Sequence, residues 1–233
     1  MWREEGCRLV FNNENNFSGR VAVTLKLAWP FLLILFGLLV VFYFTAPIFM
    51  PLPVLLAVFI IYFFRNPRRN IPTAENLILS PADGVIVGID EVYEENFIKG
   101  KAIRVYIFLS IFNVHINRSP LQGEVRYRYY RAGRFIPAFK SHASEINEKN
   151  YIGIKSNSYK LVVCQITGFI ARRIKCWVTE GKKLASGEIF GAIKFGSGAE
   201  LFIPMESELV VKKGDRVRAG ETIIGILPLD KFN

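Results

Sequence analysis

The sequence has few of the side chains that metal sites and disulfide frameworks require. It contains three cysteines, Cys7, Cys164 and Cys176, whose spacing matches neither a metal site nor a set of disulfides. Cys164 and Cys176 lie in apolar runs, so we expect core thiols in a cytoplasmic, reducing setting. Only two histidines are present, His115 and His142. We therefore expect no metal centre.

Charge is missing from one long segment. Residues 27–64 contain no charged side chain, and they account for the high mean hydropathy of the whole chain, +0.26. As one straight helix they would extend about 57 Å, whereas a bilayer core is only about 30 Å thick. Three prolines between residues 47 and 53 interrupt the segment near its middle. We predict a transmembrane helical hairpin with passes near 27–46 and 52–64.

The charges that flank this segment are mostly positive. Arg20 and Lys26 precede it, and Arg65, Arg68 and Arg69 follow it. Positive residues mark the cytoplasmic side of a membrane, so both ends of the hairpin are predicted to lie there. This places the remainder of the chain on the cytoplasmic face of the cell (inner) membrane. A single span with an interfacial stretch and a cleaved signal peptide are the alternatives.

The remaining sequence divides naturally around this hairpin. We predict a cytoplasmic segment over 1–26, the hairpin over 27–64 and a catalytic domain over 65–233. The net charge of the chain is +10; since 1–26 contributes +1 and 27–64 contributes none, 65–233 carries +9. Such a charge suits an anionic partner, and the neighbouring apolar segment favours the lipid bilayer over nucleic acid. No nucleic-acid-binding module is recognisable.

Short β-runs separated by glycine and proline dominate the catalytic domain. Residues 77–90, LILSPADGVIVGID, predict a strand, a turn and a strand, and residues 159–178 predict two strands or a strand and a short helix. Residues 180–188 and 213–221 form a weak repeat whose glycines are six residues apart, as in lipoyl-carrying β-domains. We predict an α+β protein: a mostly β catalytic domain of sandwich-like or barrel-like sheets with glycine corners, behind an N-terminal transmembrane hairpin.

A Gly-Ser-Gly sequence at 196–198 stands between two strand-like runs. Ser197 would need a base to become a nucleophile, and His115 with an orienting Asp83 could supply one. Each of the three also has an ordinary structural interpretation: a hairpin turn, a core histidine and a turn-forming aspartate. The sequence alone does not show whether the three side chains meet.

Several blocks in a fixed order resemble the short, membrane-anchored form of the phosphatidylserine decarboxylases. The blocks are FFRNPRR, SPADG, FLSIFNVHINRSPLQGEV, ASEINEKN, QITGFIARRIKCWV and GEIFGAIKFGSGAELFIP. Together they cover most of the chain, which makes the resemblance more specific than any single motif.

The resemblance implies a proenzyme that cuts itself. His115, oriented by Asp83, would take the proton of Ser197, whose oxygen would attack the carbonyl of Gly196. The resulting ester would break into a β-chain, 1–196, and an α-chain whose first residue, the former Ser197, becomes a covalent pyruvoyl cofactor. That ketone would decarboxylate phosphatidylserine to phosphatidylethanolamine, with His115 as the expected proton donor.

Residues for substrate binding are marked less directly. Arg172 and Arg173 could pair with a phosphate or carboxylate, and Glu145, Asn147 and Glu148 could line the headgroup pocket. For both groups the alternative is a solvated face or loop.

Three positions depart from the family pattern. Phe112 replaces a second histidine of longer members, Gly198 stands where arginine or threonine is common, and His142 stands where lysine is usual, so it is not counted as catalytic. Two other functions stay open: a membrane-anchored serine hydrolase or peptidase with the same three residues, and a non-catalytic lipoyl-like β-domain. The sequence does not decide whether the protein forms a homo-oligomer.

Overall fold

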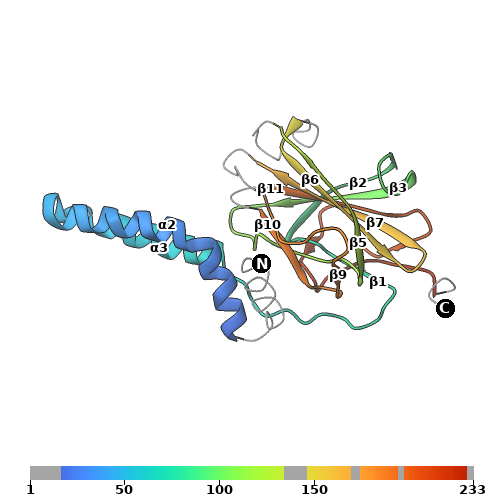
Figure 1. The fold of residues 1–233 in the computed structure, drawn as a ribbon, viewed down its shortest axis with the longest axis horizontal. Helices are drawn as coiled ribbons and strands as arrows, with labels where there is room; N and C mark the ends of the chain where they lie inside the picture. Colours follow the sequence, from blue (N-terminus) through green and yellow to red (C-terminus); the bar gives the residue numbers. More distant parts are fainter. Residues whose placement is uncertain (1–16, 134–145, 169–173, 194–196, 230–233) are drawn as a thin grey trace. The chain divides into compact units, whose positions relative to one another are not determined.

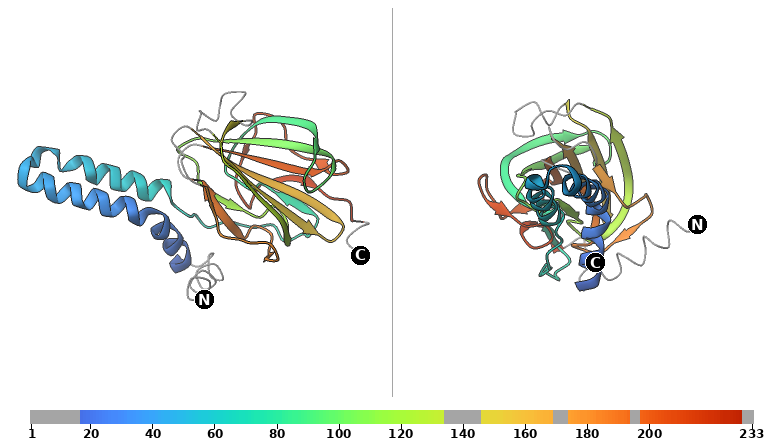
Figure 2. Two further views of the ribbon diagram at one scale, coloured as in Figure 1. Left: turned by 45° about the horizontal axis from the view of Figure 1, so that its top comes forward. Right: turned by 90° about the vertical axis from the view of Figure 1, so that its left-hand side faces the viewer.

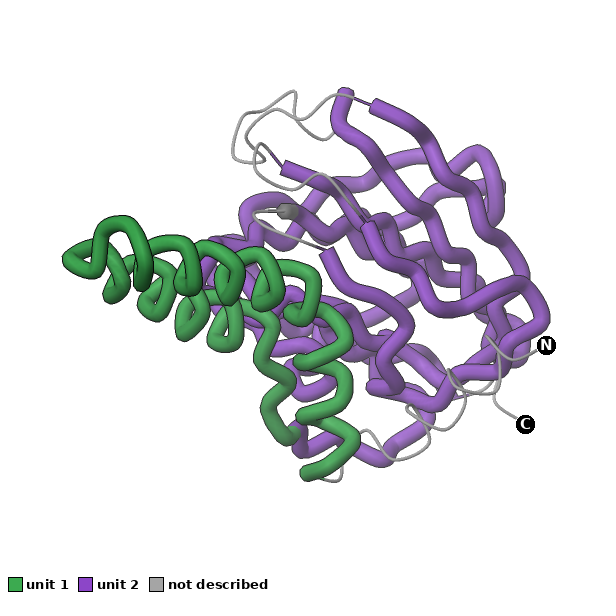
Figure 3. The backbone as a smooth tube through the Cα atoms, turned by 60° about the vertical axis from the view of Figure 1, so that its left-hand side comes forward, with its two compact units in different colours: residues 1–68 green, residues 69–233 purple. Residues whose placement is uncertain are grey.

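The computed structural model describes residues 17–133, 146–168, 174–193 and 197–229. The chain divides into two compact units, Met1–Arg68 and Arg69–Asn233 (Figure 3). Each unit has its own architecture and is described separately.

Two apolar helices lying side by side make up the described part of the first unit (Figure 1). Helix α2 (Phe17–Thr45) leads through the short 3-10 helix η1 (Pro47–Phe49) into helix α3 (Pro51–Phe63). The predicted break at the prolines is therefore present, because a proline ring excludes the preceding turn of a helix. The rings of Phe31 and Phe64 stack across the pair, with centroids 5.8 Å apart.

The first helix begins at Phe17 and not near residue 27, because polar residues such as Arg20 and Lys26 are compatible with a helix. Pro30 lies inside α2, and Figure 1 shows this helix bent, as an internal proline causes. Of the described helices, α2 alone is long and apolar enough to cross a bilayer.

The outward-facing surface of the two helices is apolar. Exposed large side chains along α2, η1 and α3 include Leu33, Ile34, Phe36, Val41, Phe44, Ile48, Leu52, Leu55, Val58 and Ile61. A continuous apolar surface of this kind marks a membrane or protein contact. The first unit is thus suited to membrane association.

Three antiparallel sheets form the described part of the second unit. The largest has eight strands in the order β13-β2-β3-β11-β7-β6-β5-β9 and is curled, while β1-β14-β12 and β4-β10-β8 form two smaller sheets (Figures 1 and 2). The protein is therefore α+β with a mostly β second unit, as predicted. The strands are β1 (Leu77–Leu79), β2 (Gly84–Glu94), β3 (Gly100–Leu109), β4 (Ile116–Arg118), β5 (Gly123–Arg131), β6 (Lys149–Ser156), β7 (Tyr159–Thr167), β8 (Ile174–Cys176), β9 (Lys183–Leu184), β10 (Ile189–Ile193), β11 (Ser197–Pro204), β12 (Glu208–Leu209), β13 (Arg216–Val217) and β14 (Ile223–Ile226).

The strands on either side of the Gly-Ser-Gly sequence belong to different sheets. β10 pairs with β4 and β8, whereas β11 pairs with β3 and β7 in the middle of the large sheet. Ser197 opens β11, opposite Leu109 on one side and Thr167 on the other. The alternative interpretation as a hairpin turn is therefore wrong, because the two flanking strands do not pair with each other.

The weak sequence repeat belongs to a longer structural repeat. The turn Ser80–Gly84 joins β1 to β2, and the turn Ser119–Gly123 joins β4 to β5. In each turn the serine hydroxyl donates a 2.7 Å hydrogen bond to the carbonyl two residues later. Each serine carbonyl also accepts a 2.9 Å hydrogen bond from the second glycine of a repeat segment, Gly220 or Gly187.

The same repeat shapes both edges of the large sheet. β13 pairs with β2 at one edge and β9 pairs with β5 at the other, so the two repeat segments take equivalent places. The turn and the edge strand thus occur twice in the second unit, once in each half of the structural repeat.

Alternate residues of β11 face opposite sides of the large sheet. Ala199, Leu201 and Ile203 lie in the main core. Phe202 faces the other side, where it belongs to a second apolar cluster formed by Ala102, Val162, Cys164, Ile166 and Phe202. Cys164 is fully buried there, as expected, while Cys176 is half-buried.

Candidate active site

Asp83 lies in the turn between β1 and β2, where a cation and a backbone amide hold its carboxylate. The Arg69 Nη2 atom donates to both Asp83 oxygens at 2.8 Å, and the backbone N–H of Ala219 donates to Oδ1 at 2.8 Å. The Arg69 side chain also lies 3.4 Å from Glu221, and both members of the Arg69–Asp83 pair are largely buried. Breaking such a pair would leave an uncompensated buried charge, so the cluster fixes the position of the turn.

Only one half of the structural repeat contains this cluster. Gln122 stands in the second turn where Asp83 stands in the first. The counterpart of Glu221 is Glu188, which accepts from the Ala185 N–H at 2.8 Å and pairs with Lys182 instead of a distant arginine. The two turns thus share their backbone hydrogen bonds and differ in the side chain at this position, which is acidic in Asp83 and neutral in Gln122.

His115 is buried at the end of the loop that precedes β4. Its Nδ1 atom lies 2.9 Å from the carbonyl oxygen of Asn113. A carbonyl can only accept, so Nδ1 carries the proton in this contact. In the neutral imidazole the second nitrogen, Nε2, is then the basic one, which is the form that a general base requires.

Backbone hydrogen bonds tie the Asp83 turn, the His115 loop and the strand before Ser197 together. The N–H of Arg118 donates to the Pro81 carbonyl at 3.0 Å, which joins the turn to β4. The N–H of Ile193, at the end of β10, donates to the carbonyl of His115 at 2.9 Å. The three predicted catalytic residues thus lie on segments that are joined or adjacent, although the Ser197 side chain and Gly196 lie outside the described residues.

A row of three buried amides supports the same turn. Asn150 donates to Gln165 at 2.8 Å, Gln165 donates to Asn117 at 2.9 Å, and Asn117 donates to the carbonyl of Pro81 at 3.3 Å. Because a carbonyl can only accept a hydrogen bond, Asn117 must donate its N–H to Pro81, and each amide of the row donates toward this turn. Gln165 lies opposite Ala199 of β11, so the row connects the large sheet with the Asp83 turn.

Two of the predicted substrate-binding residues are buried beside the end of strand β7. Asn147 donates its side-chain amide to the Thr167 carbonyl at 2.8 Å, and the Thr167 N–H donates to the Glu148 carbonyl at 3.1 Å. Thr167 is the residue opposite Ser197. The alternative that Asn147 and Glu148 belong to a solvated loop is therefore wrong. Glu145, Arg172, Arg173 and His142 lie outside the described residues.

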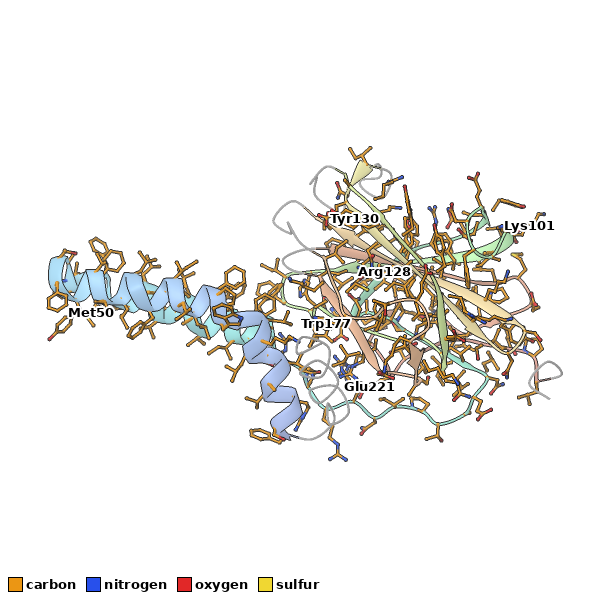
Figure 4. The ribbon with its side chains drawn as sticks, in the orientation of Figure 1. Met50, Lys101, Arg128, Tyr130, Trp177 and Glu221 are labelled. Atoms are coloured by element: carbon orange, nitrogen blue, oxygen red, sulfur yellow. The ribbon has the colours of Figure 1, made fainter. Side chains whose placement is uncertain are left out.

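Sequence reasoning did not single out Arg69 or Gln165 as parts of the site. Arg69 was visible within the FFRNPRR block, but its partners Asp83 and Glu221 lie 14 and 152 residues away. Glu221, labelled in Figure 4, was noted only as part of the repeat. A lone glutamine in the apolar run LVVCQIT was the available signal for Gln165.

The chain is similar to known proteins over most of its length. Residues 56–225 match the family model described as phosphatidylserine decarboxylase. The chain is 56% identical over 172 residues to a phosphatidylserine decarboxylase proenzyme of Carboxydothermus hydrogenoformans. These residues are 73% of this chain and 81% of that protein. The chain is also similar to proteins with the same description from two other organisms. It is 47% identical over 174 residues to the protein of Symbiobacterium thermophilum, which is 74% of this chain and 81% of that protein. It is 43% identical over 200 residues to the protein of Syntrophus aciditrophicus, which is 84% of this chain and 93% of that protein.

Proposed function

Because the chain belongs to the phosphatidylserine decarboxylase family and is a decarboxylase of phospholipid biosynthesis made as a proenzyme, we propose that it cuts itself between Gly196 and Ser197. The observation that carries this proposal is the position of Ser197, at the start of a central strand whose neighbour in sequence belongs to another sheet. The substrate is phosphatidylserine, and the products are phosphatidylethanolamine and carbon dioxide.

The base, the nucleophile and the carbonyl that react in the proposed cleavage all belong to the chain itself. His115 Nε2 takes the proton of the Ser197 hydroxyl, and the oxygen attacks the carbonyl carbon of Gly196. As the peptide C–N bond breaks, His115 gives this proton to the departing nitrogen, which leaves an ester and a free amine. Loss of the α-proton of residue 197 then breaks the Cβ–O bond and releases the β-chain as a carboxylate. The dehydroalanine left on the α-chain gains water and loses ammonia, which leaves a pyruvoyl group.

Asp83 supports the base in this scheme. Proton transfer from Ser197 makes His115 positive, and a carboxylate in the neighbouring turn stabilises that charge. Arg69 and the Ala219 amide keep Asp83 in place. The Asn113 carbonyl meanwhile holds the histidine ring through Nδ1.

The fold suits a covalent group at residue 197. A break between β10 and β11 leaves every hydrogen-bonded neighbour of both strands in place, since the two strands pair in different sheets. The new chain end is then held between β3 and β7. A pyruvoyl ketone at residue 197 would supply an electrophile for the substrate amine and an electron sink for the release of the carboxylate.

Residues beside the cleavage strand would contact the headgroup. Asn147 and Glu148 flank Thr167, and a carboxylate at Glu148 suits the ammonium of a serine headgroup. Arg172 and Arg173, which follow β7, suit its phosphate or carboxylate. Glu145 belongs to the same proposed pocket.

The decisive measurement uses the purified full chain in vesicles containing phosphatidylserine. We expect release of carbon dioxide and accumulation of phosphatidylethanolamine. Cyanoborohydride added during turnover should attach the substrate amine to the small fragment, and hydroxylamine should inactivate the enzyme by reacting with the ketone. Activity that resists hydroxylamine would exclude the ketone, and labelling of Ser197 by a fluorophosphonate would favour a serine hydrolase.

The helical hairpin would hold the enzyme in the cell membrane with both ends on the cytoplasmic face. Met50 marks the tip of the hairpin (Figure 4). In intact cells, a membrane-impermeant maleimide should label Met50→Cys from outside but should label the exposed Glu75→Cys only after permeabilisation. Labelling of Glu75→Cys in intact cells would contradict this orientation.

A further inference from the structure

Gly198 follows the proposed cleavage serine directly, and Tyr106 on the neighbouring strand β3 closes one side of it. A β-carbon placed on residue 198 would lie 2.5 Å from Tyr106 Cε2 and 2.8 Å from the phenol oxygen. Both distances are below the 3.0 Å that real β-carbons respect. Any side chain at residue 198 would therefore require the ring to move.

The Tyr106 ring is partly buried and has apolar side chains packed against it. Tyr106 lies opposite Glu200 and Gly198 lies opposite Phe108, so both residues face the same side of the sheet. On that side Tyr106 packs against the second apolar cluster. Residue 198 thus meets a ring that has packed side chains behind it.

The polar end of Tyr106 lies in a fixed electrostatic environment. Burial, together with the Glu200 carboxylate, raises the pKa of Tyr106 to about 12. Glu200 is itself buried and pairs with Lys149, with an Nζ–Oε2 distance of 3.2 Å. The phenol therefore stays neutral over the range in which cleavage would be measured, and its contact with residue 198 does not change with pH.

We propose that Tyr106 is a positioning residue for the cleavage site, whose ring holds residue 198 in place and accepts only glycine there. This inference rests on the proposed cleavage at residue 197. The role follows from the chain connectivity: residue 197 is attached to the sheet through its peptide bond with residue 198. Fixing residue 198 limits the directions from which the Ser197 hydroxyl can approach the preceding carbonyl, and orientation of this kind is a large part of the rate of an intramolecular attack.

The same contact would act after cleavage. The peptide between residues 197 and 198 then carries the ketone, and the Tyr106 ring keeps that peptide from turning within the sheet. Tyr106 is not placed in contact with the reacting atoms by this argument. Its effect is transmitted through the backbone of Gly198.

The test is a rescue experiment on the full-length chain, read as the half-time of conversion into the fragments 1–196 and 197–233. Gly198→Ala should slow conversion at least about tenfold, since overpacking against the ring shifts the backbone. The double variant Gly198→Ala/Tyr106→Ala should recover to within about threefold of Tyr106→Ala alone. Tyr106→Phe keeps the ring, so by itself it should convert at nearly the wild-type rate and should not rescue Gly198→Ala.

Tyr151→Ala is the matched control, because Tyr151 packs against the same apolar cluster and is not among the nearest neighbours of residue 198. Tyr151→Ala should not rescue Gly198→Ala. Equal rescue by Tyr151→Ala, or wild-type conversion of Gly198→Ala, would overturn the inference.

Thermal unfolding of each variant in an uncleavable Ser197→Ala chain separates folding from positioning. Equal melting temperatures with different conversion rates support positioning. If Gly198→Ala instead lowers the melting temperature and Tyr106→Ala restores it without restoring conversion, the contact is purely structural and the inference fails. A wild-type chain that never cleaves would instead reject the proposed function.

Discussion

Replacing Ser197 by alanine should leave one intact chain of 233 residues. The wild-type chain is expected to yield two fragments, 1–196 and 197–233, with the amino end of the smaller one blocked to Edman sequencing. Alanine has no hydroxyl to attack the preceding carbonyl, so neither the cut nor the ketone can form. A denaturing gel and an intact mass measurement distinguish these outcomes.

Ser186 supplies the control for this experiment. It also precedes a glycine, in the repeat segment 180–188, and it lies in the second unit as Ser197 does. Ser186→Ala should be processed like the wild type. If Ser197→Ala is still cut at residue 196, the self-cleavage mechanism is wrong and another protease makes the cut.

Replacing His115 by glutamine should slow the conversion by about 10²–10⁴-fold, the usual contribution of a positioned general base. Glutamine keeps a polar group of similar length in the buried site, so the effect reports loss of proton transfer more than loss of packing. The measurement is the half-time of fragment formation after refolding or synthesis, followed at several pH values.

His142→Gln serves as the control and should convert normally. Unchanged conversion of His115→Gln would remove this residue from the role of base.

Local patterns in the sequence predicted the elements of the fold but not their partners. The turn SPADG and the strands around it follow from glycine, proline and β-branched residues, and they are present as β1 and β2. The pairing of β1 with β14, at the other end of the domain, has no local signal. For the same reason the Gly-Ser-Gly sequence resembled a hairpin turn although its two flanking strands lie in different sheets.

The site shows the same division between local and distant information. Asp83, His115 and Ser197 stand out by residue type and by resemblance to a family. Arg69 does not, because its role depends on a contact with Glu221 across 152 residues. Asn147 and Glu148 read as a polar loop, yet both are buried, with the Asn147 amide donating to the Thr167 carbonyl and the Glu148 backbone carbonyl accepting from the Thr167 N–H. Hydrogen bonding to a distant strand cannot be recognised in a local window of sequence.

The distribution of strands determines what would become of the two fragments after the proposed cleavage before residue 197. The piece that begins at residue 197 contributes the central strand β11 and the edge strand β13 to the large sheet, and β12 and β14 to a sheet with β1. Neither piece can leave without dismantling two sheets. Each cleaved molecule would therefore retain its own small fragment, and mixing two cleaved variants would produce no hybrids unless both were first unfolded.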